Sequence, residues 1–99
     1  MAKVYITEYV DAGGGPFNAT APSIAPVVEQ TPITSSGSSQ QSAAFNAKTN
    51  RIRVHTDGII SFQVGANPTA STSTSRMAAN ATEYFAVSPG AKIAVITNT

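Results

Sequence analysis

The chain has 99 residues, no Cys, no Leu and a net charge of +1. Only 11% of its residues are charged, against about 25% in an average soluble domain, which excludes a strong electrostatic attraction to nucleic acid or membrane. The missing Cys excludes disulfides and thiol chemistry. Abundant Val, Ile and Thr without Leu favour β-strands, because branched side chains suit a pleated surface.

Residues 3–10 (KVYITEYV) read as the first strand, with Val4, Ile6 and Val10 alternating with polar or aromatic side chains. Three glycines and a proline within residues 11–17 then break the pattern. Glycine and proline do not continue a sheet ladder cheaply, so we expect a flexible turn there.

Residues 18–34 contain Pro22, Pro26 and Pro32 among short apolar pieces. Prolines at this density exclude a helix and a central strand, which leaves an extended arm or an edge strand. An extended segment of this kind can reach a neighbouring subunit, because proline lowers the entropy lost on ordering. The three prolines are therefore candidate partner contacts.

A polar stretch and a weak strand signal follow. Residues 35–42 (SSGSSQQS) have the composition of a loop or linker. Residues 42–47 (SAAFNA) predict a short strand centred on Phe45, closed by a turn at residues 48–50.

The strongest local signal is a β-hairpin. Residues 51–56 (RIRVHT) alternate cleanly, with Ile52 and Val54 on one face. The pair Asp57-Gly58 suits a type I′ turn with positive φ at both residues. Residues 59–65 then form the returning strand, with its apolar side chains on one face.

The last third predicts a long loop and two more strands. Residues 66–75 are expected to cross from one strand to the next, between two sheets, before Arg76-Met77 returns to the core. Residues 75–81 allow one helical turn but show no amphipathic period. Residues 83–87 and 91–97 read as strands, joined by Pro89-Gly90 in a type II turn.

These signals predict an all-β chain: a small antiparallel β-sandwich or jelly-roll-like barrel of about six to seven strands. We expect a single domain over residues 1–99, with residues 11–41 as a Pro/Gly-rich extended arm and residues 42–99 as the best-defined β core. The N-terminus lacks the apolar run of a signal peptide, and no stretch approaches a membrane span. The expectation is synthesis and folding in a cytoplasm.

No catalytic, metal or cofactor site is expected. His55 is the single histidine, and no nucleophile motif accompanies it. The five carboxylates are scattered, and no loop holds three of them. The expectation is a non-enzymatic protein without a cofactor.

Lys48, Arg51 and Arg53 form the one basic cluster, and the two arginines should share a strand face with His55. Nucleic-acid binding also wants aromatic side chains interleaved with the cations, and this strand face shows none. Three alternatives stay open for this cluster: a solvated face, contact with an acidic protein partner, and nucleic-acid binding, which the missing aromatic side chains disfavour. The three tyrosines lie in strands where burial in a core or interface is expected.

The sparse charge also bears on assembly. A free monomer with so few charges is poorly protected against association. We therefore expect much of the surface to contact identical copies or a larger partner.

A resemblance supports this expectation. Within residues 51–97, an apolar strand ends at Gly65, and VGANPTAS leads into a polar loop. RMAANATEYFAVSPGAKIAVI follows, with a Pro-Gly hairpin before the final strand. This order resembles small virion-associated proteins of tailed bacteriophages.

The resemblance implies a non-enzymatic β-sandwich present in many copies on a phage particle. It implies a capsid decoration or cement protein that binds the major capsid protein, as a homo-oligomer with a trimer favoured. The alternatives are a tail- or fibre-associated accessory protein and a carbohydrate-binding knob. No nucleic-acid or membrane partner is implied, and the expected location is the virion.

Overall fold

The computed structural model describes residues 2–10 and 28–99, and within these residues it contains nine strands and no helix. The strands are β1 (Lys3–Tyr9), β2 (Val28–Glu29), β3 (Ile33–Thr34), β4 (Gln40–Gln41), β5 (Arg51–Thr56), β6 (Ile60–Gly65), β7 (Ser75–Met77), β8 (Ala81–Ala86) and β9 (Lys92–Thr97). All their pairings are antiparallel. The expected all-β sandwich is confirmed.

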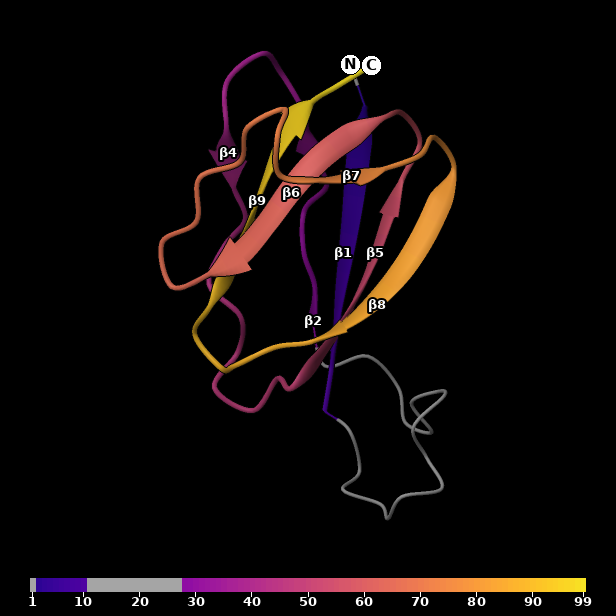
Figure 1. Ribbon diagram of the computed structural model, residues 1–99. Helices are drawn as coiled ribbons and strands as arrows, with labels where there is room; N and C mark the ends of the chain where they lie inside the picture. The colour runs from indigo at the N-terminus through magenta and orange to yellow at the C-terminus, as the bar shows by residue number, and fades with distance from the viewer. Residues whose placement is uncertain (1, 11–27) are drawn as a thin grey trace.

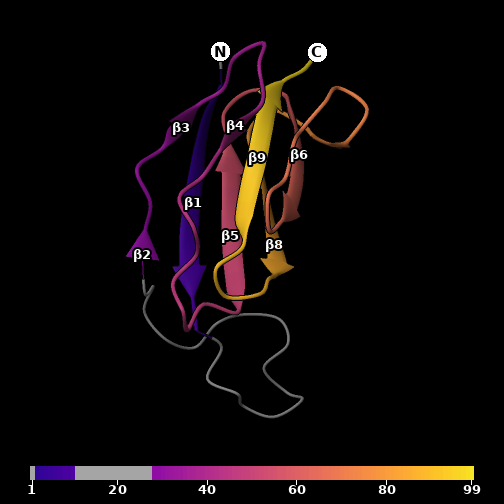
Figure 2. The same ribbon diagram turned by 90° about the vertical axis from the view of Figure 1, so that its left-hand side faces the viewer.

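The strands form two sheets packed face to face (Figure 1). The first sheet has the order β2-β1-β5-β8, with β3 also paired to β1. The second sheet has the order β4-β9-β6-β7. We call them sheet A and sheet B. Figure 2 looks onto this stack, with β9 of sheet B in front of β5 of sheet A.

The core lies between the sheets and follows the strand alternation. Ile52 and Val54 of β5 are fully buried against β1 residues Val4 and Ile6 and the side chains of sheet B. Phe62 of β6 packs on Phe85 of β8, with ring centroids 5.1 Å apart. Because strand side chains alternate between faces, the residues between the core positions of β1 and β5 lie on the outer face of sheet A. In sheet B, Ser61 and Ala94 lie between core positions and are also buried.

The predicted hairpin over residues 51–65 is wrong. Both strands exist, but β5 pairs with β1 and β8, whereas β6 pairs with β7 and β9. The turn between them carries the chain from sheet A to sheet B. Each strand has apolar residues on one face. This pattern predicts which face of the strand is buried, but it does not identify the strand that pairs with it.

The type I′ turn predicted at Asp57-Gly58 is also wrong, because neither residue has positive φ. Asp57 instead accepts a hydrogen bond from the backbone N–H of Lys3 to its Oδ1, at 2.7 Å. A Cβ on Gly58 would lie 2.9 Å from the Cβ of Ala2. Glycine is required here for close approach to β1.

The Pro89-Gly90 turn is confirmed, but it does not close a hairpin. Gly90 has φ of +81°, as the third position of a type II turn requires. The N–H of Ala91 donates to the carbonyl of Ser88 at 3.2 Å, closing the turn. The turn then joins β8 of sheet A to β9 of sheet B.

The expected crossing at residues 66–75 is misplaced. The strands on either side of this loop, β6 and β7, pair directly in sheet B. The chain crosses to sheet A later, between Met77 and Ala81, where Asn80 adopts φ of 58°. Met77 is fully buried, so the expected return to the core is confirmed. Residues 75–77 form β7 in place of a helical turn.

The described part of the expected arm, residues 28–41, pairs within its own chain. β2 and β3 lie along β1, and β4 lies along β9. For residues 18–34 the sequence allowed an extended arm or an edge strand, and within the described residues 28–34 the structure shows edge strands. The strand expected at residues 42–47 is absent, although Phe45 is buried and its N–H donates to the Ala91 carbonyl at 2.8 Å.

Glu8 is buried on the inner face of β1, with 1% of its surface exposed. Its Oε1 accepts hydrogen bonds from the backbone N–H of Asn46 and the hydroxyl of Thr49, both at 2.7 Å. Its Oε2 accepts from Nε2 of Gln30 at 2.8 Å. The carboxylate therefore ties the edge segment and the turn before β5 to the first strand.

Candidate functional site

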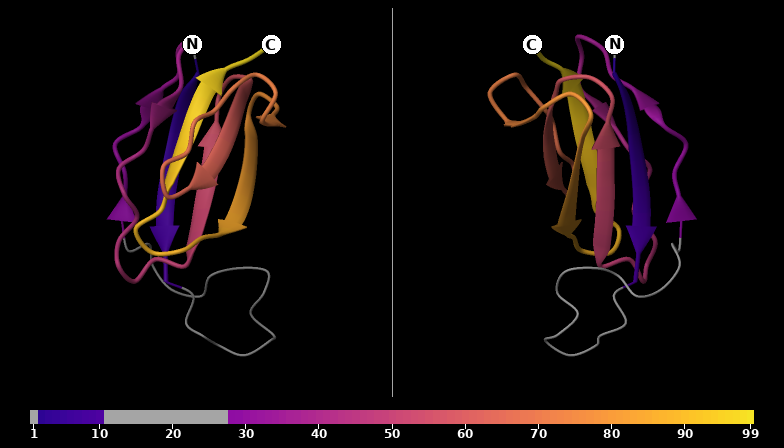
Figure 3. Two further views of the ribbon diagram at one scale, coloured as in Figure 1. Left: turned by 60° about the vertical axis from the view of Figure 1, so that its left-hand side comes forward. Right: turned by 90° about the vertical axis from the view of Figure 1, so that its right-hand side faces the viewer.

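The outer face of sheet A gathers aromatic and cationic side chains. All three tyrosines of the chain lie on this face together with both arginines of β5 and the single histidine. We call this surface the Tyr–Arg face; it consists of Tyr5, Tyr9, Arg51, Arg53, His55 and Tyr84. In Figure 3 (right) the three strands that carry it, β1, β5 and β8, lie side by side.

The strand register interleaves these side chains. Arg53 of β5 lies between Thr7 of β1 and Tyr84 of β8. One step along β5, His55 lies between Tyr5 and Thr82 in the same way. Directly opposite residues in antiparallel strands have Cβ atoms about 4.5–5.5 Å apart, so the rings and guanidinium groups are neighbours.

The aromatic groups at this face are exposed to different degrees. Tyr5 is 40% exposed and Tyr84 is 51% exposed, and no other large hydrophobic side chain of the described residues is as open. The rings of Tyr5 and His55 lie with centroids 6.1 Å apart and tilted by 45°. His55 Nδ1 lies 2.7 Å from the hydroxyl oxygen of Thr82, which fixes the orientation of the imidazole.

Charge on this face leans positive. Lys3, Arg51 and Arg53 lie on it, while Glu8 points into the core. Glu29 lies beside Thr7 at the β2 margin, and Asp57 follows the end of β5. The centre of the face, around Arg53, therefore combines cations with tyrosines.

The candidate partner contacts separate into three groups. Arg51 and Arg53 lie on the Tyr–Arg face, as expected from their alternation on β5. Lys48 is exposed in the turn before β5, and Pro32 is exposed between β2 and β3. Pro22 and Pro26 lie outside the described residues.

The expectation that no aromatic side chain accompanies the basic cluster is wrong. Within β5 itself none does, but the neighbouring strands place Tyr84 beside Arg53 and Tyr5 beside His55. Tyr5 and Tyr84 are exposed in the single chain, so they do not lie in the core; the alternative for them, burial in an interface, stays a prediction. Residues 5 and 84 are far apart in sequence, so only the strand order could have revealed the cluster.

No catalytic or metal-binding arrangement is apparent in residues 2–10 and 28–99. These residues contain no group of three or more His, Asp or Glu side chains that could hold a metal ion. The one polar side-chain partner recorded for His55 is Thr82, and no carboxylate orients its imidazole. No helix in the described part of the chain is long and apolar enough to span a membrane.

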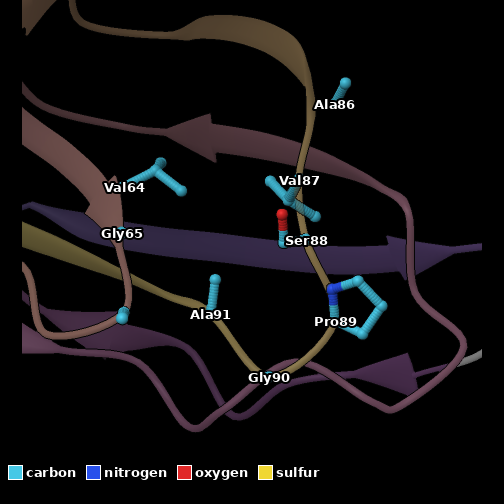
Figure 4. A pocket seen from close by; sticks show the side chains of 9 residues that line it. Val64, Gly65, Ala86, Val87, Ser88, Pro89, Gly90 and Ala91 are labelled. Carbon is cyan, nitrogen blue, oxygen red and sulfur yellow. The ribbon is translucent and has the colours of Figure 1, made fainter.

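Two shallow hollows lie between the sheets on the side of β8. The first, of about 640 Å³, is lined by residues 64–66 and 86–91 (Figure 4). There Val64, at the end of β6, faces Val87 and Ser88. The second, of about 480 Å³, is bounded by Phe62, Phe85 and the loop before β7. Neither is lined by a charged side chain, so they are weak candidates for a polar ligand.

Comparison of the chain with protein-family models, with curated proteins and with solved structures finds no match.

Proposed function

We propose that this protein is a non-enzymatic structural component of a tailed-phage virion. It acts as a capsid decoration or cement protein that binds the major capsid protein through the Tyr–Arg face. The observation that carries the proposal is the exposure of Tyr84 next to Arg53 and of Tyr5 next to His55 on one sheet face. The order of motifs within residues 51–97 supplies the phage context.

The residue types at this face suit protein docking. Tyrosine and arginine are enriched among residues that dominate interface energies, since they combine large contact area with hydrogen-bonding groups. The side chains project from three paired strands, so little backbone entropy is lost when a partner binds. The central strand β5 is buried on its other face, which keeps the face rigid.

The partner surface should be acidic and able to accept tyrosine rings. Arg53 and Arg51 favour carboxylates, which they can bind through two parallel hydrogen bonds. The low content of charged residues in the whole chain is consistent with a subunit whose surface is in permanent contact with other proteins. A homo-oligomer, either a trimer or another cyclic oligomer, remains part of this proposal.

Cosedimentation with purified capsids of the encoding phage tests the proposal. We expect the full chain to bind capsids. The double variant Tyr5→Ala/Tyr84→Ala should bind capsids at least about tenfold more weakly, because residues that dominate an interface cost this much affinity when they are truncated. Thr72→Ala, in the exposed loop before β7, is the matched control and should bind like the parent. Far-UV circular dichroism checks that each variant folds.

Two results would contradict the proposal. One is a folded parent chain that does not bind capsids. The other is a double variant that binds as tightly as the parent, because the Tyr–Arg face would then not be the docking surface. Binding to purified tails in place of heads would instead support the tail- or fibre-accessory alternative.

A carbohydrate-binding knob is the second candidate function. Exposed tyrosine rings are the platforms on which sugars stack, and Tyr5 and Tyr84 provide two of them. A glycan array separates the candidates. Binding to a defined glycan that is lost in Tyr5→Ala/Tyr84→Ala would favour the knob, and an array without hits would remove it.

A further inference from the structure

β8 is an edge strand whose outer side pairs with no other described strand. It ends the order β2-β1-β5-β8, and its single strand neighbour is β5. Four of its six residues are exposed and the other two are only partly buried. In Figure 3 (right) it lies at the side of sheet A opposite to β2.

The register determines which backbone groups point outward. The N–H of Val87 donates to the carbonyl of Asn50 at 3.1 Å, one step beyond the pairing of Ala86 with Arg51. In an antiparallel ladder the residues that exchange hydrogen bonds with one neighbour alternate with those that point away. The outward N–H and C=O groups therefore belong to Thr82, Tyr84 and Ala86.

The other edges of the described sheets are protected by their short length, whereas β8 is long and carries a single charge, Glu83, on its inner face opposite Val54. β2, β3 and β4 have two residues each, and β7 has three. Short strands are one way in which proteins avoid edge-to-edge pairing; lysine, proline and bulges are others. β8 has six residues and contains no Lys, Pro or Gly. Among the edges of the described sheets, β8 is therefore the one most suited by its length to pairing with a further strand.

The side of the sandwich next to β8 is also open between the sheets. Both hollows described above lie there, and Phe85 and Phe62 border one of them. A strand added to β8 would extend sheet A over this apolar opening. The unpaired backbone edge and the apolar opening therefore both favour a strand bound along the outer side of β8.

We propose that the occupant is a second copy of this chain, paired antiparallel through β8 about a two-fold axis at Tyr84. In this register Tyr84 exchanges both backbone hydrogen bonds with its counterpart. Thr82 of each copy does the same with Ala86 of the other. All three outward residues of each strand are then used, and an isologous contact of this kind closes on itself.

Charge favours this register and a copy of the same chain. Two-fold pairing must oppose residues of the same face, so the neighbouring registers centre on Glu83 or on Phe85. The first places two carboxylates directly opposite, and the second pairs Thr82 with Ser88, which lies beyond the end of β8. The Tyr84-centred register puts Glu83 opposite Phe85. Glu83 is the single charged residue of β8, and the chain has a net charge of +1, so little repulsion opposes self-association.

The contact extends the proposed function but does not depend on it. It joins two copies of sheet A side by side, so their Tyr–Arg faces become one continuous surface. Pairing about a two-fold axis gives dimers in place of the trimer that the phage resemblance implies. A dimer that fails to bind capsids would contradict the proposed function alone.

The mass of the full chain in solution tests the contact. Sedimentation equilibrium should give about 20 kDa, twice the 10.2 kDa of one chain. Ala86→Pro removes an outward N–H and leaves the hydrogen bonds to β5 in place, because proline is tolerated on a strand edge. We expect it to weaken the dimer at least tenfold. Ala86→Val keeps the N–H and is the matched control.

Cysteine cross-linking tests the register, since the chain has no Cys of its own. Opposed residues in a hydrogen-bonded antiparallel pair have Cα atoms about 5.5 Å apart, within the range of a disulfide. We expect Tyr84→Cys to form a covalent dimer on mild oxidation. Glu83→Cys, which faces residue 85 of the other copy, should remain monomeric on a non-reducing gel.

Three results would overturn the proposal. They are a monomeric parent chain, an oligomer unaffected by a folded Ala86→Pro variant, and cross-linking of Glu83→Cys in preference to Tyr84→Cys. A different protein bound along β8 would appear as a parent monomer and would count against a second copy.

Discussion

At the scale of single residues, Glu8 shows how a polar side chain can organise a small β-sandwich. It is buried on the inner face of a strand whose neighbouring core positions are Val4 and Ile6. Three donors surround it, so its burial is compensated. The sequence presents Glu8 as one of five scattered carboxylates, because its donors come from residues 30, 46 and 49.

Replacing Glu8 by glutamine should destabilise the fold. The amide nitrogen of glutamine cannot accept a hydrogen bond, so at least one buried donor loses its partner, at a cost of about 1–3 kcal/mol. Urea unfolding measures the change. Glu83→Gln, an exposed carboxylate on β8, is the control and should stay within about 0.5 kcal/mol of the parent. Equal unfolding midpoints for the two variants would contradict a structural role for Glu8.

At the scale of elements, the alternation of side chains located most strands but did not reveal their partners. Residues 51–56 and residues 59–65 were expected close to their true bounds, yet they belong to different sheets. The same holds for β8 and β9 around a correctly predicted turn. A connection of a few residues can close a hairpin or cross between sheets, and local residue types do not distinguish these outcomes.

For the candidate site, too, the sequence predicted the faces of single strands but not which strands lie next to one another. Alternation within β5 correctly placed Arg51, Arg53 and His55 on one face. The tyrosines that complete the Tyr–Arg face come from β1 and β8, and strand order brings them there. Strand order depends on long-range packing, which a single sequence does not display.

Gly58, in the connection that carries the chain from β5 to β6, is a test of the close contact with Ala2. Gly58→Ala places a Cβ 2.9 Å from the Cβ of Ala2, and the resulting backbone shift should destabilise the fold by about 1–3 kcal/mol. Thermal unfolding measures this. Gly65→Ala has open space at its Cβ and should not destabilise. Adding Ala2→Gly should recover part of the stability; no recovery would mean that the contact with Ala2 is not the cause.

At the scale of the whole molecule, the sandwich has two surfaces suited to assembly. The Tyr–Arg face presents exposed aromatic and cationic groups, and the outer edge of β8 presents backbone groups that pair with no other described strand. The two surfaces adjoin at Tyr84, whose side chain belongs to the face and whose backbone belongs to the edge. If both proposals hold, one chain binds a copy of itself and a larger partner at the same time.

The central claim is the proposal that this chain is a capsid decoration protein, and electron microscopy of the virion in which it is proposed to occur tests that claim most directly. We expect density for the sandwich on the outer surface of the head, with β1, β5 and β8 turned toward the major capsid protein and Tyr5 and Tyr84 in the contact. A virion without this chain on its head, or a bound sandwich whose Tyr–Arg face points to solvent, would contradict the claim.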